Sequence, residues 1–125
     1  MSNQVRVFES STDGENIAAG HVIFSQGDHG DKMYAVQSGE VDILFNGKVV
    51  ETVGEGGIFG EMAIIDEAPR SAGAVARTDC KIVPVDQKRF LYMVQNTPFF
   101  AISVMRVISQ RVRKLDRLSY ESEQK

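Results

Sequence analysis

Residues 56–76 read GGIFGEMAIIDEAPRSAGAVA, a mostly small and apolar stretch that contains a glutamate, Glu61, and an arginine, Arg70. The guanidinium of Arg70 presents a planar fork of N–H donors that matches two oxygens of a phosphate or a carboxylate. Small residues follow it, beginning with Ser71 and Ala72, and leave room for a ligand. The glycines allow close approach to the backbone, and FGEMA can begin a helical turn whose first N–H groups attract anions. The stretch therefore predicts a local anion site.

Glu61 adds a second requirement, because a carboxylate close to a phosphate would repel it. An ionised carboxylate only accepts hydrogen bonds, so it suits a ligand that also offers a hydroxyl group. A ribose phosphate carries both groups. We therefore expect a ligand of this kind.

Catalysis and metal binding are weaker interpretations of the same residues. No nucleophile–base pair or metal cluster accompanies Glu61 and Arg70, so we expect a receptor and not an enzyme. The two histidines, His21 and His29, are expected at the surface near turns, and Cys80 is expected to be a small buried hydrophobic residue. A glutamate or an arginine taken singly is usually a solvated surface residue. The ligand hypothesis rests on the two together.

Length and composition favour a single domain over residues 1–125. The formal net charge of −3 argues against a protein that binds nucleic acid directly. No run approaches the roughly 18 consecutive apolar residues of a membrane span, and the first residues lack the features of a signal peptide. One cysteine cannot form an internal disulfide, which suits a reducing compartment, so we expect a cytoplasmic protein.

The elements that must position these residues are predicted to be strands first and helices last. Short runs rich in Val, Ile, Tyr and Phe alternate with turn residues, as in GHVIFSQGD, KMYAVQSGE, EVDILFNGK, VVETVGEGG, AGAVARTD and CKIVPVD. Asn46-Gly47 predicts a two-residue hairpin turn. We expect a mainly β fold, a jelly-roll β-barrel (β-roll) over about residues 5–86.

Two or three helices are expected over about residues 87–119, with a break at Pro98. The last helix carries an apolar stripe, which we expect either to pack on the barrel or to form a dimer seam: Ile102, Met105, Ile108, Val112 and Leu115. Its basic residues are interpreted as a solvated face: Arg106, Arg111, Arg113, Lys114 and Arg117.

With these motifs in place, the sequence resembles the cyclic nucleotide-binding domains of catabolite-activator-type regulators, kinase regulatory subunits and gated channels. Their phosphate-binding cassette is matched by Phe59-Gly60-Glu61-Met62-Ala63 and, after a variable loop, by Arg70-Ser71-Ala72. The resemblance extends from about residue 17 to 118. It departs at VRVFESSTDGEN, which looks extended where the family commonly has a helix, and at Gly73 and Ala74, where the family often has hydroxyl or β-branched residues.

The resemblance implies a role for each part of the cassette. Glu61 would accept a hydrogen bond from the ribose 2′-OH, and Arg70 would pair with the exocyclic phosphate oxygens. Backbone N–H groups around Gly60, Met62 and Ala72, with the Ser71 hydroxyl, would complete the phosphate site. The family pattern favours cAMP over cGMP, because a threonine at position 71 would favour cGMP.

The resemblance also implies how the domain signals. The final helix would close on the base, with Lys114 and Leu118 as the lid, and its movement would change a surface for an unknown protein partner or for a second copy of the chain. No metal or cofactor other than the nucleotide is expected. The alternative is an interaction module of the same fold that binds no ligand.

Overall fold

The computed structural model describes residues 6–123, and within this range the side chains except those at positions 6, 115, 116 and 118–123. Two four-stranded antiparallel sheets form a roll. One sheet has the order β1-β8-β3-β6, made of β1 (Glu15–Ile17), β8 (Cys80–Asp86), β3 (Lys32–Ser38) and β6 (Ile58–Phe59). The other has the order β2-β7-β4-β5, made of β2 (Val22–Phe24), β7 (Gly73–Ala76), β4 (Val41–Phe45) and β5 (Lys48–Val53). The mainly β, jelly-roll prediction is confirmed.

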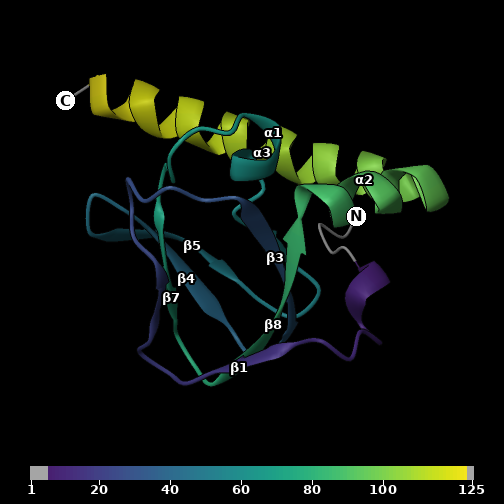
Figure 1. Cartoon of the computed structure of the whole chain (residues 1–125). Helices are drawn as coiled ribbons and strands as arrows, with labels where there is room; N and C mark the ends of the chain where they lie inside the picture. Colours follow the sequence, from purple (N-terminus) through teal and green to yellow (C-terminus); the bar gives the residue numbers. More distant parts are fainter. Residues whose placement is uncertain (1–5, 124–125) are drawn as a thin grey trace.

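The helices lie at one end of this roll (Figure 1). The short α1 (Met62–Ile65) interrupts the strands, and α2 (Gln87–Asn96) and α3 (Pro98–Glu123) follow them. In Figure 1, α3 crosses the end of the roll and α1 lies beneath it. Pro98 is the first residue of α3, a position where its missing N–H costs no helical hydrogen bond. The N-terminal flank forms a 3-10 turn, η1 (Arg6–Phe8), and then β1, so its expected extended character holds only in part.

The hairpin between β4 and β5 turns at Asn46-Gly47, as the sequence predicts. The two residues have φ of 51° and 81°. A two-residue turn with positive φ at both positions matches the right-handed twist of the flanking strands.

Strands β3 and β8 are covered on both faces. Met33 and Ala35 of β3 pack toward the helices, and Val36 packs into the roll. Since successive strand residues point to opposite faces, a strand covered on both sides needs a continuous apolar run. The runs KMYAV and KIVPV are of this kind.

The helix face that packs on the roll differs from the predicted stripe. Phe100, Val104 and Val107 of α3 are buried against the sheet and α1. Met105 is 56% exposed and Val112 is 48% exposed, so these two residues do not pack on the barrel, whereas Ile108 packs against the helix-side core. The side chain of Leu115 lies outside the described part of the chain, and the dimer seam stays a prediction. Both stripes repeat every three or four residues, and periodicity alone does not choose between them.

The two histidines and the cysteine lie where the sequence predicts them. His21 and His29 are exposed, and Cys80 is buried in the roll interior. Within the described residues, no three His, Cys, Asp or Glu side chains form a group able to hold a metal ion. None of the helices in residues 6–123 has both the length and the apolar character of a membrane span.

Candidate ligand-binding site

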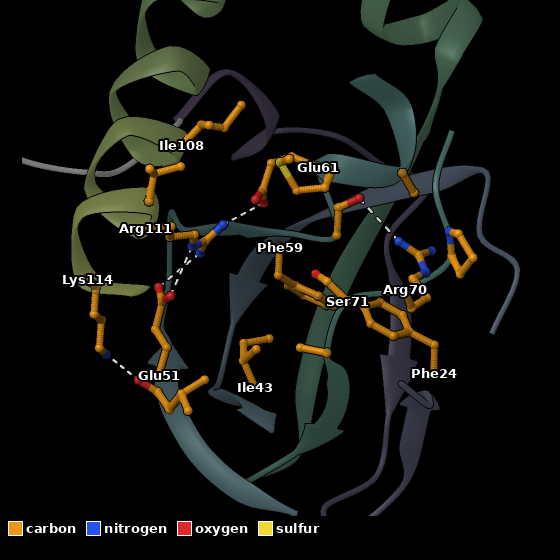
Figure 2. Close-up of a pocket in the computed structure, with 17 residues that line it drawn as sticks. Phe24, Ile43, Glu51, Phe59, Glu61, Arg70, Ser71, Ile108, Arg111 and Lys114 are labelled. Carbon is orange, nitrogen blue, oxygen red and sulfur yellow. Dashed lines mark hydrogen bonds and ion pairs between the residues drawn. The ribbon is translucent and has the colours of Figure 1, made fainter. Parts of the chain in front are cut away.

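A cavity of about 280 Å³ lies between the roll and α3. Figure 2 shows the side chains of α3 on one side of it and Arg70 on the other. The lining comes from both sheets, α1 and α3: Phe24, Ile43, Val50, Glu51, Phe59, Gly60, Glu61, Met62, Ala63, Pro69, Arg70, Ser71, Ala72, Ile108, Arg111, Val112 and Lys114.

The structure brings the predicted cassette residues to this one cavity. Both segments of the cassette, residues 59–63 and 70–72, line it although a loop separates them in sequence. Of the two predicted lid residues, Lys114 also lines the cavity. Leu118 belongs to α3, and its side chain lies outside the described part of the chain.

Arg70 is only 7% exposed, and its guanidinium is incompletely satisfied. Its Nη1 donates to the Gly60 carbonyl at 3.1 Å, and its Cζ lies 3.9 Å from the centre of the Phe24 ring. Its Nε is buried and has no hydrogen-bond partner among the described residues. Burial lowers the pKa of Arg70, and the nearby Tyr34 and Asp31 offset part of that effect. A buried donor without a partner is costly, so this side chain is ready to receive an anion.

The backbone holds Arg70 against the roll. Its N–H donates to the Asp28 carbonyl and its carbonyl accepts from the Gly27 N–H, each at 2.8 Å. A Cβ at Gly30 would collide with the guanidinium, so a glycine is needed where the chain passes behind Arg70. Gly60 has φ of 76° just before α1, a conformation that other residues rarely adopt.

Glu61 is 5% exposed and has an ionic partner that the sequence did not suggest. Its Oε1 accepts from Nη1 of Arg111 at 2.5 Å, across from α3 (Figure 2). Arg111 also donates to both oxygens of Glu51 in β5, each at 2.9 Å. Burial lowers the pKa of Arg111, but the charges and hydrogen bonds of Glu61 and Glu51 outweigh it and raise the pKa. The interpretation of Arg111 as part of a solvated face is therefore wrong.

Lys114 lies one helical turn beyond Arg111 and is also engaged. Its Nζ donates to the Val50 carbonyl in β5 (Figure 2). Arg113, between them, is exposed, as the solvated-face interpretation predicts. Only the basic residues on the roll-facing side of α3 take part in the site.

Sequence reasoning missed the wall of the cavity outside the cassette. Phe24 and Ile43 come from segments that the sequence predicts as strands, without any sign that their side chains line a site. Arg111 had a usable signal, because it continues the spacing of the buried Phe100, Val104 and Val107 by one more turn. A basic side chain in line with buried apolar residues of a helix needs an anionic partner, which Glu51 and Glu61 provide for Arg111.

The charges in the lining leave one positive charge in excess. Arg70, Arg111 and Lys114 are cationic, whereas Glu51 and Glu61 are anionic. The excess suits a ligand with one negative charge. The rest of the lining is mostly apolar, which suits a flat aromatic group.

Comparison with known proteins identifies the same family as the cassette motif does. The family described as "Cyclic nucleotide-binding domain" matches residues 14–97. The cAMP-dependent protein kinase regulatory subunit of Eremothecium gossypii is 38% identical over 81 residues, which are 65% of this chain and 18% of that protein.

Two solved structures are also similar. The catabolite activator protein of Thermus thermophilus has a TM-score of 0.76 at 30% identity, covering 89% of this chain and 56% of that one. The cAMP-bound form of the EAL enzyme Bd1971 has a TM-score of 0.62 at 35% identity, covering 88% and 31%. The chain therefore spans less than a fifth of the curated relative and about half of the bacterial activator.

Proposed function

Because the chain belongs to the cyclic nucleotide-binding domain family, we propose that its cavity binds cAMP and that α3 transmits the binding as a change in position. The observation that carries the proposal is the buried, incompletely satisfied guanidinium of Arg70 at the cavity wall. A cyclic phosphate has one negative charge, which matches the positive charge in excess, and two exocyclic oxygens, which match the guanidinium fork.

The other contacts follow from the same lining. Glu61 takes the ribose 2′-OH, and the Ser71 hydroxyl with the N–H groups around Gly60, Met62 and Ala72 completes the phosphate site. The purine lies against the apolar side chains, beside Lys114 of α3, and Leu118 stays the second predicted lid residue. Since a serine at position 71 does not fix its rotamer as a threonine would, cAMP is favoured over cGMP.

We also propose that the domain is a cytoplasmic receptor and not an enzyme, with no cofactor besides the nucleotide. Both histidines are exposed and neither lines the cavity. The output is a changed α3 surface for a protein partner or for a second copy. For a signal to result, the ligand must contact one position of α3 better than another.

The test is calorimetric titration of the folded chain with cAMP. We expect binding in the wild type and a loss of about 2–5 kcal/mol in Arg70→Ala, the cost of truncating one side of a buried charge pair. Arg77→Ala is the matched control, since Arg77 is exposed and does not line the cavity. It should bind as the wild type does.

Equal affinity in Arg70→Ala and the wild type would overturn the phosphate role of Arg70. A folded wild type that binds neither cAMP nor cGMP would leave the alternative, an interaction module without a ligand.

A further inference from the structure

One side of α3 presents large apolar side chains to solvent. Phe99 is 72% exposed, Met105 is 56% exposed and Ile102 is 41% exposed. With 3.6 residues per turn, positions two apart lie on opposite sides of a helix, so Ile102 points away from the buried Phe100 and Val104. In Figure 1 the roll lies below α3, and this opposite side of the helix faces outward. Exposed apolar side chains that gather on one face mark an interaction surface.

Two exposed arginines continue the same side of the helix. Arg106 comes four residues after Ile102 and Arg113 follows seven residues later, so the three lie along one stripe of α3. No ion pair within the described part of the chain involves either arginine. We call Phe99, Ile102, Met105, Arg106 and Arg113 the outer face of α3.

The helical segment is basic although the chain as a whole is acidic. Residues 87–115 contain six lysines and arginines and no aspartate or glutamate, whereas the formal net charge of the whole chain is −3. The arginines of the outer face are therefore left without carboxylates from their own helix. Because interfaces between proteins pair positive with negative potential, a partner for this face has to be acidic.

The composition of the outer face is that of a protein interface. Aromatic residues, Met and Arg are enriched where proteins meet, and Lys, Asp and Glu are depleted. Arg106 and Arg113 are separated by about 10 Å along the helix axis, the rise of seven residues. A second helix that lies along α3 presents carboxylates at the same separation when they too are seven residues apart in its sequence.

A second copy of this chain is a poorer occupant of the outer face. Two parallel copies of α3 would place Arg106 and Arg113 opposite themselves, since the same residues meet across a two-fold axis. Two antiparallel copies would place the apolar first turns against DRLSYESE, the charged and polar end of the helix sequence. Neither arrangement covers the apolar residues and balances the arginines together.

We propose that the outer face of α3 is a docking surface for an acidic amphipathic helix of another protein, which covers its apolar residues and pairs carboxylates with Arg106 and Arg113. The inference rests on the proposed function, because it names the partner that the output of α3 would reach. Docking is measured without nucleotide, so its failure and a failure of cAMP binding are distinguishable.

The experiment measures the fluorescence anisotropy of labelled synthetic helices on titration with the whole chain. The acidic peptide has leucines along one face and glutamates seven residues apart beside them, and the second peptide has lysines in place of the glutamates. The wild type should bind the acidic peptide at least about tenfold more tightly, the effect of one close charge pair at an interface. Arg106→Glu/Arg113→Glu should reverse that preference.

A second double variant, Phe99→Ser/Met105→Ser, tests the apolar part of the face. It should weaken binding of the acidic peptide at least about tenfold, because it removes most of the apolar area that a partner would cover. Val22→Ser and Lys48→Glu are the matched controls, since Val22 is 54% exposed in β2 and Lys48 is exposed in β5. Both controls should bind the acidic peptide as the wild type does.

None of the substituted side chains lines the cavity, so cAMP titrations of these variants should match the wild type. Equal affinity of the wild type for the two peptides, binding of neither, or an unchanged preference in Arg106→Glu/Arg113→Glu overturns the inference and leaves the proposed function intact. A wild type that binds the acidic peptide but no cyclic nucleotide supports the docking surface and overturns the proposed function.

Two further outcomes would assign the outer face to another occupant and overturn the inference. The first is binding to vesicles of phosphatidylserine and phosphatidylcholine without a preference between the peptides, which indicates a membrane surface. The second is a concentration-dependent dimer of the wild type, measured by sedimentation, that is lost in Phe99→Ser/Met105→Ser.

Discussion

Arg70 and Glu61 are both nearly fully buried, yet they are satisfied to different degrees. Glu61 has Arg111 as an ionic partner, whereas Arg70 has a carbonyl, an aromatic face and a buried Nε without a partner in the described part of the chain. Without a ligand, Glu61 is therefore better satisfied by ionic and hydrogen-bond partners than Arg70 is. A phosphate would supply the missing partner for Arg70.

The choice between cAMP and cGMP is expected to depend on the residue after Arg70. Ser71→Thr should raise the affinity for cGMP relative to cAMP by about three- to tenfold, the effect of one better-held hydrogen bond. The reason is that the β-branch restricts χ1 and holds the hydroxyl between the phosphate and a guanine amino group. Competition binding with the two nucleotides measures the ratio.

Ser71→Ala is the control for this prediction, because it removes the hydroxyl and should not favour cGMP. If Ser71→Thr leaves the ratio of the two affinities unchanged, position 71 does not set selectivity in this chain.

At the scale of elements, α3 is where sequence reasoning was least complete. Its first turns are apolar on several sides, since Phe99, Phe100, Ile102, Val104 and Met105 all occur within two turns. The buried face is determined by what the sheet and α1 offer opposite the helix, and the sequence of α3 does not contain that information. For the same reason the sequence does not reveal the role of Arg111 in the cavity wall, because its partners Glu51 and Glu61 are 60 and 50 residues away in the chain.

The strands were predicted more completely, because they depend on local signals. Each of the six apolar runs became a strand, and Asn46-Gly47 formed the expected turn. Two strands went unrecognised as separate elements, β1 and β6, since ENI contains one apolar residue and IF only two, too few to show a strand pattern. The cassette was found because its residues are close in sequence, whereas the rest of the cavity wall is assembled only by the fold.

The end of α3 is expected to act as a lid. Deletion of residues 114–125 removes Lys114 and its contact with β5, together with Leu118, so it should weaken cAMP and cGMP by similar factors. The reason is that an apolar cap covers either purine in the same way. Titration of both nucleotides measures the effect.

Deletion of residues 120–125 alone is the matched control, because it keeps both lid residues and should leave the affinities unchanged. Undiminished affinity after the longer deletion would remove the lid from the mechanism.

In the whole molecule, the cavity lies where the roll, α1 and α3 meet. The helix-side core joins α3 to β3, β8 and α1 through Phe100, Val104 and Val107, while Arg111 and Lys114 join its next turns to the cavity wall. One helix therefore has an apolar attachment at its start and a polar attachment beside the cavity. We propose that a ligand shifts the position of the second part while the first part stays packed.

Amide hydrogen exchange of the full chain, with and without saturating cAMP, tests this coupling most directly. We predict slower exchange with cAMP in two segments that are distant in sequence, the cavity wall at residues 58–73 and the part of α3 at residues 108–114. Residues 15–17 and 77–80, which do not line the cavity, should exchange unchanged. Protection of the cavity wall without protection of α3 would contradict transmission through the helix, and no protection in either segment at saturating cAMP would contradict cyclic nucleotide sensing by this cavity.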